Sequence, residues 1–519
     1  MNVRLAYTWL LVWLMWLPSD LSAHSFSLVQ GAVLVHRKKL DLTLKIASED
    51  ILWSAGMDIA RAGQVDRPYL EKGATAHRKY LLDGMVLRDA DGQRIEGVII
   101  KVESPPVPEG GISVEDLLPQ FYIYHVEYSL LSPPATLTFQ QNFHTGRTLA
   151  MVSMQASIKR AGQDSGIIVP IPGGDAILTV AFDWSNPSAL PTEVAQVSPV
   201  AEPSDLFFYI QNDEVRVEIL MPLATLEALI PVSRTNNERF DIDEQNALRL
   251  RLERFFDSQN EVRIDGVIIR PKIDRIDFVG PDTMDLSTRP ASKSLDAISA
   301  RLAVILSYTA KSPPRQVNLK WSLFNEQVRS VRPLVFGYDK SARFVLTPTQ
   351  PTFVWTNTEP VSLPKIEVVD LKQSADSESA RFKLTEKLIQ NVYRGFDYRK
   401  ESDIYDALAQ SVSGKLLTDL YLKIKQGLIL QEQGGAIARV SEVKVIAAAA
   451  SGGSDKSGFR QHVTWQVTGT VEHWGHIHTR INEYSADLGF APLDGAWRII
   501  SLDATKQNQV KSVMSLRKL

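Results

Sequence analysis

The 519-residue chain contains no cysteine, which excludes disulfide bonds, thiolate chemistry and a lipoprotein-type signal sequence. An excess of one charge is also missing, since 57 Lys and Arg stand against 60 Asp and Glu. No global electrostatic argument therefore favours nucleic acid or an anionic membrane surface as a partner. The motifs Gly-x-Ser-x-Gly, His-Glu-x-x-His and the phosphate-binding glycine loop do not occur, which argues against the common hydrolases and nucleotide-binding enzymes.

Long hydrophobic runs are rare, and the clearest one lies at the N-terminus. Leu5–Leu17 is an uninterrupted apolar stretch, ended by Pro18 and followed by the small residue Ala23. It is too short to span about 30 Å of hydrocarbon comfortably, and the pattern is typical of a secretory signal peptide. We predict a signal peptide over 1–23, with an uncleaved membrane anchor as the alternative. No later apolar run approaches the length of a membrane-spanning helix, so we expect a soluble mature chain that is periplasmic or secreted.

Three segments of the first half of the chain recur in the second half, in the same order. The pairs are LDLTLKIASEDIL from Leu40 with VRVEILMPLATLEAL from Val215, RIEGVIIK from Arg94 with RIDGVIIR from Arg263, and YSLLSPPATLTF from Tyr128 with YTAKSPPRQVNL from Tyr308. The spacing is similar in all three pairs, and insertions in loops explain the small differences. Such a repeat indicates that one structural unit has been duplicated.

Alternating apolar and polar residues in both copies indicate β-strands. Leu40–Ile46 and Tyr122–Tyr128 follow the two-residue period of a half-buried strand, and the prolines of the shared Ser-Pro-Pro element belong in a connection between strands. We predict two tandem β-sandwich-like, mainly β modules of immunoglobulin-like general shape. The expected boundaries are 24–185 for copy 1, 186–204 for an extended Pro-rich linker, 205–358 for copy 2 and 359–378 for a second linker.

Both modules also resemble a known extracytoplasmic region. The segment AHSFSL, the strand that runs into a short helix, the glycine-bearing strand and the Tyr-x-x-x-Ser-Pro-Pro element are similar to the N-terminal region of HupE/UreJ-type membrane proteins. The resemblance covers each copy loosely and implies a surface or periplasmic module. The transmembrane helices that follow in that family have no counterpart in this sequence, so no metal-transport role is carried over.

The region 379–519 places helices before strands. Leu384–Phe396 and the stretch that Ser402 opens are typical of amphipathic helices, and a third helix is expected to end at Gly434. Alternating strands follow, the last one reading Gly-x-Trp-Arg-Ile. This order resembles the NTF2-like superfamily over about Ser379–Gln507, which implies an α+β domain whose curved sheet and helices form a cone-shaped pocket. Because the superfamily includes isomerases, dehydratases and non-catalytic binding proteins, the resemblance leaves the function open.

The densest group of metal-binding residue types is Glu472–His478, which reads EHWGHIH. If the Trp-Gly pair inside it forms a hairpin turn, two of the histidines share one face of the returning strand. A polar hairpin without a metal, whose histidines bond to backbone carbonyls, is the alternative, since a fourth ligand is missing from the pattern. The candidate ligands for Zn²⁺ or Cu²⁺ are His473, His476 and His478.

Other patterns could also carry chemistry. His24 would be the first residue after cleavage and could chelate copper as in copper-dependent polysaccharide monooxygenases, with His36 as the second ligand; an ordinary first residue is the alternative. Asp89–Gly92 has the start of a calcium loop but not its later acidic ligands, which favours a plain turn. A base and an oxyanion donor of the ketosteroid-isomerase type, or an ordinary helix start, could come from Asp397, Tyr398, Asp403, Tyr405 and Asp406.

These patterns together favour an exported, non-catalytic interaction or scaffold protein whose pathway the sequence does not name. We expect a protein partner in the periplasm, no nucleic acid partner, no cofactor, and a homodimer through the C-terminal domain. A metal- or small-ligand-binding protein that uses the His473–His478 hairpin is the first alternative. An enzyme acting in the C-terminal pocket is the second.

Overall fold

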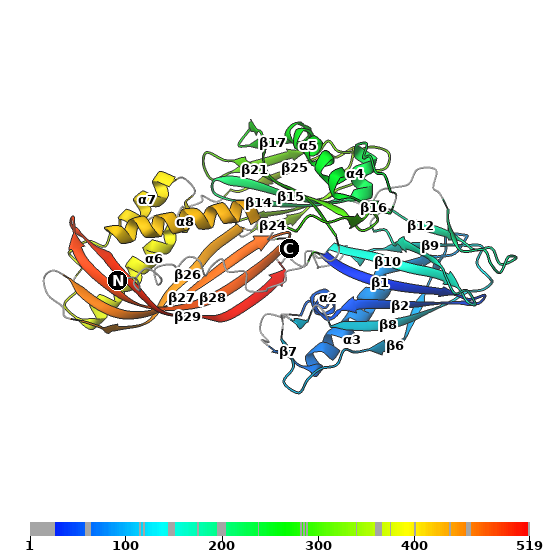
Figure 1. Ribbon diagram of the computed structural model, residues 1–519, viewed down its shortest axis with the longest axis horizontal. Coiled ribbons are helices and arrows are strands. Elements are labelled where there is room, and N and C mark those ends of the chain that lie inside the picture. Colours follow the sequence, from blue (N-terminus) through cyan, green and yellow to red (C-terminus); the bar gives the residue numbers. More distant parts are fainter. Residues whose placement is uncertain are drawn as a thin grey trace. The chain divides into compact units, whose positions relative to one another are not determined.

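The computed structural model (Figure 1) describes residues 26–516 except 58–63, 114–115, 118–119, 144–150, 174–175, 195–203, 237, 281–282, 284–285, 287–288, 339, 359–365, 374, 399–400, 435–436 and 453–457. The predicted signal peptide, 1–23, and His24 lie outside these residues. The chain divides into two compact units, one of Ser22–Pro360 with Trp474–His476 and 516–519, and one of Val361–His473 with Ile477–Ser515. In the part of the chain that is described, no helix is long and apolar enough to cross a membrane.

The first module, blue to cyan in Figure 1, is mainly strand with two helices. Its longer helix begins at the N-cap Asp66, whose side chain accepts a hydrogen bond from the amide N–H of Tyr69. The elements are β1 (Phe26–Val35), β2 (Lys39–Ala47), α2 (Ser48–Ser54), β3 (Gln64–Val65), α3 (Arg67–Gly84), β4 (Met85–Arg88), β5 (Arg94–Ile95), β6 (Gly97–Glu103), β7 (Ile112–Ser113), β8 (Phe121–Ser129), β9 (Thr136–Gln141), β10 (Met151–Arg160), β11 (Ile167–Pro170), β12 (Leu178–Ala181) and β13 (Thr192–Glu193).

The second module, in green, follows the same order of elements. Its longer helix also begins after an aspartate, Asp241, which forms a capping box with Glu244. The elements are β14 (Asp205–Ile210), β15 (Glu214–Pro222), α4 (Leu223–Leu229), β16 (Arg239–Phe240), α5 (Ile242–Gln259), β17 (Glu261–Ile264), β18 (Val267–Ile269), β19 (Lys272–Val279), β20 (Leu295–Asp296), β21 (Arg301–Thr309), β22 (Gln316–Lys320), β23 (Arg332–Gly337), β24 (Lys340–Arg343) and β25 (Thr352–Thr356).

The two modules have the same sheet topology. The large sheet runs β11-β10-β1-β2-β8-β6 in the first module and β24-β23-β14-β15-β21-β19 in the second, and the parallel pair β1–β10 corresponds to β14–β23. The smaller sheets run β12-β9-β4-β5 and β25-β22-β17-β18, the first one extended by β13, and β3–β7 corresponds to β16–β20. The sequence repeat is therefore accompanied by a repeat of the three-dimensional arrangement.

One of the three repeated segments is not structurally equivalent in the two copies. RIDG of the second copy ends β17 and forms its hairpin turn, with positive φ at Asp265 and Gly266, whereas RIEG of the first copy joins β5 to β6. The true partner of β6 is β19, which carries the same β-bulge next to β21 that β6 carries next to β8. The match of RIEGVIIK with RIDGVIIR is thus only a local similarity, because its first two residues lie in the edge strand β5 in the first copy but in β17, between β18 and β22, in the second. The turn equivalent to Asp89–Gly92, which joins β4 to β5, is correspondingly Asp265–Gly266, which joins β17 to β18.

The second module has one core shared by two sheets and a helix, whereas an immunoglobulin-like sandwich is built of antiparallel sheets alone. In the second module the rings of Phe208 on β14 and Phe353 on β25 meet edge to face with centroids 5.0 Å apart, so the two sheets share the core. Helix α5 adds Leu248, Leu252 and Phe256 to the same core. The long helices α3 and α5 and the parallel strand pairs were not expected from the sequence. Their buried residues nevertheless recur at the three- to four-residue spacing of a helix.

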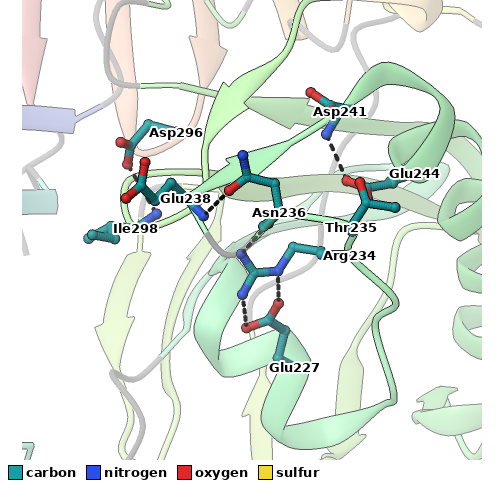
Figure 2. A network of polar contacts seen from close by, with 9 residues as sticks. All are labelled: Glu227, Arg234, Thr235, Asn236, Glu238, Asp241, Glu244, Asp296 and Ile298. Atoms are coloured by element: carbon teal, nitrogen blue, oxygen red, sulfur yellow. Dashed lines mark hydrogen bonds and ion pairs between the residues drawn. The ribbon is translucent and has the colours of Figure 1, made fainter.

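A network of polar contacts holds the connection between α4 and α5 (Figure 2). Arg234 donates to both carboxylate oxygens of Glu227, at 2.7 and 3.4 Å. Glu244 accepts from the amide N–H groups of Asp241, at 2.9 Å, and Thr235, at 2.6 Å. Because these groups bond to one another and cap the start of α5, we assign the network a structural role.

Part of the predicted linker 186–204 belongs to the first module. β13 pairs with β12, and the guanidinium of Arg160 donates to the carbonyl oxygens of Asn186, Pro187 and Ala189 at 2.7 to 3.0 Å. Residues 195–203 lie outside the described residues. The extended, free-standing connection that the prolines predicted therefore does not begin at 186.

The described part of the C-terminal domain, yellow to red in Figure 1, has three α-helices and one 3-10 helix before a four-stranded antiparallel meander. The sheet order is β26-β27-β28-β29, and alternate residues of its strands, such as Val463 and Trp465, pack against the helices. α7 starts at Glu401, one residue before the N-cap that the sequence predicted. The elements are α6 (Glu378–Arg394), the 3-10 helix η4 (Gly395–Asp397), α7 (Glu401–Ala409), α8 (Lys415–Gly434), β26 (Ile437–Ala450), β27 (Phe459–His473), β28 (His476–Leu493) and β29 (Ala496–Leu516).

Candidate functional site

The C-terminal domain contains an apolar pocket between its helices and its sheet. Its volume is about 40 Å³, and it is partly open to solvent. Helices α6 and α8 contribute one wall and strands β27, β28 and β29 the other. The lining side chains are Ile389, Val392, Tyr393, Phe396, Leu416, Leu420, Ile424, Trp465, Leu488, Ile499 and Leu502.

The two polar atoms in this lining are paired with each other. The indole Nε1–H of Trp465 donates to the hydroxyl oxygen of Tyr393 at 3.1 Å. Burial raises the pKa of Tyr393 well above its usual value, so its phenol remains neutral. A bound group would therefore contact an apolar surface, because the polar atoms of Tyr393 and Trp465 already have hydrogen-bond partners.

The carboxylates and tyrosines predicted for a catalytic pocket are not among the described residues that line it. Asp397 pairs with Arg394 at 3.3 Å, and Asp403 accepts a hydrogen bond from Ser402 at 3.0 Å. Tyr405 is 41% exposed, and Asp406 is exposed on the same helix. Burial and the Asp397 carboxylate raise the pKa of Tyr398. The geometry thus does not bring an Asp base and a Tyr donor together in this cavity, as a ketosteroid-isomerase-like reaction requires.

The hairpin predicted to bind metal has its turn at Trp474 and Gly475, with φ of +46° and +82°. His473 ends β27 and His476 begins β28, so His476 and His478 occupy alternate positions of one strand. The side chains of His473, His476 and His478 lie outside the described part of the structure. Zn²⁺ or Cu²⁺ binding by this hairpin therefore stays a prediction.

His36, the second candidate copper ligand, lies just after β1. Its Nε2 is 3.0 Å from the carboxylate of Asp41, and both side chains are about one-third exposed. The Asp89 carboxylate accepts from the amide N–H groups of Asp91 and Gln93, at 3.0 and 2.8 Å. The Asp89 carboxylate is therefore occupied by hydrogen bonds within its own turn.

A buried charged cluster that sequence reasoning did not single out lies on the large sheet of the second module, on the face opposite its core. Glu218 is 3.2 Å from the Arg216 guanidinium, and Arg275 donates to Asp277 at 2.5 Å. Burial raises the pKa of Glu218 to about 7, against the opposing effect of Arg216. These four side chains are at most 9% exposed, so the cluster is closed to a substrate and we assign it a structural role. The sequence contained one indication of this cluster, since charged residues occupy alternate positions of the predicted strand VRVEIL.

The pocket in the C-terminal domain is therefore the site whose shape and chemistry best fit binding. Its residues come from helices and strands that lie far apart in the chain, and only their apolar character was visible in the sequence. Comparisons of this chain with protein-family models and with curated proteins find no match.

Proposed function

We propose that this chain is an exported, non-catalytic interaction protein whose C-terminal domain receives an aliphatic side chain of a partner protein. The observation that carries this proposal is the apolar pocket, in which Tyr393 and Trp465 satisfy each other's polar atoms. A ligand or side chain that placed a polar group in this pocket would lose its hydrogen bonds to water, and the pocket would not replace them.

The size of the pocket favours a side chain over a free ligand. An apolar cavity of about 150 Å³ in a protein interior binds benzene, and this one measures about 40 Å³. The end of a Leu, Ile or Val side chain fits that space, while the rest of the partner stays outside the partly open mouth. Buried aliphatic anchors of this kind supply much of the affinity of protein interfaces.

The order of helices and strands supports an NTF2-like fold for the C-terminal domain. Three helices precede a four-stranded antiparallel meander, and all of them pack around one core. A periplasmic or secreted location is supported by the apolar N-terminal stretch. The likeness of the two modules to the extracytoplasmic region of HupE/UreJ-type proteins agrees with this location.

Filling the pocket is expected to weaken partner binding. Leu420→Phe adds a ring to the pocket wall, and the excluded aliphatic side chain contributes about 1.5–3 kcal/mol, so affinity should fall about 10- to 100-fold. The matched control is Leu422→Phe, the same change two residues along α8 at a position that is 55% exposed. The measurement is affinity capture of the intact chain from the cells that export it, with identified partners compared between the two variants.

A second measurement does not depend on knowing the partner. Xenon binds to dry apolar cavities, so xenon NMR should shift the methyl signals of Leu416 and Ile424 in the wild-type chain and in Leu422→Phe, but not in Leu420→Phe. If a partner captured by the wild-type chain binds Leu420→Phe equally well while the xenon signal is lost, the pocket is not its binding site.

A further inference from the structure

The contact between α2 and α3 in the first module has a polar centre where the second module has leucines. Ser54, the last residue of α2, has its Oγ 2.5 Å from Nδ1 of His77 in the middle of α3. α2 and α4 both have 7 residues, and α3 and α5 both have 18. Ser54 therefore corresponds to Leu229 and His77 to Leu252, and the fold itself does not require a polar pair here.

His77 is enclosed by aromatic and apolar groups. It is 3% exposed, and the ring centroids of Tyr80 and Tyr124 lie 5.4 and 5.6 Å from its own. Ser54 Oγ also lies 3.0 Å from the carbonyl oxygen of Ile51, the second acceptor within reach of its hydroxyl proton. Nε2 of His77 has no hydrogen-bond partner among the described residues.

Adding a second proton to this buried imidazole would be unfavourable in free energy. It would place a buried charge and a new N–H donor in a closed environment. Burial is the only cause that lowers the pKa of His77 to about 4, so neighbouring charges do not offset it. The titratable groups on the elements around it are Glu49 and Asp50 of α2, Tyr122, Tyr124, His125, Glu127 and Tyr128 of β8, Arg88 of β4, Lys101 and Glu103 of β6, and Arg67, Tyr69, Glu71, Lys72, Arg78, Lys79, Tyr80 and Asp83 of α3.

We propose that His77 makes the packing of α2 on α3 acid-sensitive: protonation of its imidazole opens this contact in the first module, while the second module, with Leu252 in the same place, stays closed. In the open form the imidazole has its ordinary pKa near 6.5, above the value of about 4 in the closed form. The open form therefore binds more protons between these values, and the closed form loses stability as the pH falls from 6.5 toward 4.

Hydrogen exchange of the full chain at pH 7 and pH 5 tests this proposal with an internal control. The opening equilibrium constant of α2 and α3, corrected for intrinsic exchange, is expected to rise roughly 20-fold between the two pH values. α4 and α5 of the same molecules should not change beyond the response shared by the whole chain. An equal response of both helix pairs would overturn the proposal.

Two substitutions exchange the residues of the modules. His77→Leu, which places the second module's residue in the first, is expected to abolish the additional opening of α2 and α3 at pH 5. Leu252→His is expected to confer it on α4 and α5. If Leu252→His fails to fold, the comparison of His77→Leu with the wild-type chain still decides, because an undiminished rise in that variant would exclude His77 as the cause.

Discussion

The variant Phe208→Ala is expected to lower the free energy of unfolding of the second module by about 3–5 kcal/mol. Phe208 is fully buried on β14, and its ring meets that of Phe353 on β25 edge to face at 5.0 Å. Removing the ring leaves a cavity between the two sheets of the module. Because Phe353 also stacks on Phe344, the surrounding rings cannot collapse freely into the space. Hydrogen exchange of β14 and β15 in the intact chain measures the loss.

The matched control is Val354→Ala. Val354 follows Phe353 on the same strand, but it is 48% exposed and lies on the opposite face. Its truncation is expected to change stability by no more than about 0.5 kcal/mol. A loss in Phe208→Ala as small as that of the control would contradict a shared core between the two sheets.

Arg160→Ala is expected to release the segment 183–194 from the first module at a cost of about 3 kcal/mol. The guanidinium is 4% exposed and donates to the carbonyl oxygens of Asp183, Asn186, Pro187 and Ala189. Charge-assisted hydrogen bonds contribute about 1.5–3 kcal/mol each, although part of their energy is recovered from water when the segment opens. Limited proteolysis between 183 and 194 and hydrogen exchange of β12 measure the release.

Two companion variants test whether the hydrogen bonds of the Arg160 guanidinium hold the segment or its positive charge alone does. Arg160→Lys keeps the charge but presents three N–H donors on one ammonium nitrogen, which cannot serve the four carbonyl groups that Nη1 and Nη2 of the guanidinium contact. It is expected to behave like Arg160→Ala. Lys159→Ala, at the half-exposed neighbouring position of β10, should leave proteolysis unchanged. Wild-type resistance in Arg160→Lys would show that charge alone holds the segment.

The repeat illustrates how far the sequence can predict the fold. Strand alternation and the shared Tyr-x-x-x-Ser-Pro-Pro element located equivalent strands, since Tyr128 and Tyr308 are the next-to-last residues of β8 and β21. The most similar segment, RIEGVIIK with RIDGVIIR, was misleading. Short strands joined at a glycine have similar local requirements wherever they occur, so their similarity does not report which strands pair.

The candidate site was less accessible to sequence reasoning than the fold. The helices of the C-terminal domain and the turns at Trp474-Gly475 and Asp494-Gly495 follow from local patterns. The pocket forms where the apolar side chains of α6 and α8 do not fill the space next to the sheet, and the contact of Ser54 with His77 forms where two helices pack. Neither arrangement can be predicted from the periodicity of residues within one segment.

The sequence by itself determined the absence of thiol chemistry, the duplicated strand-rich unit and the helix-before-strand order of the last domain, because composition and side-chain periodicity are properties of the chain itself. Only the tertiary structure decided the parallel pairing of β1 with β10, the four carbonyl partners of Arg160 and the apolar pocket beside Trp465. These features join residues that lie far apart in the chain, and the close packing of a folded interior selects which of them meet.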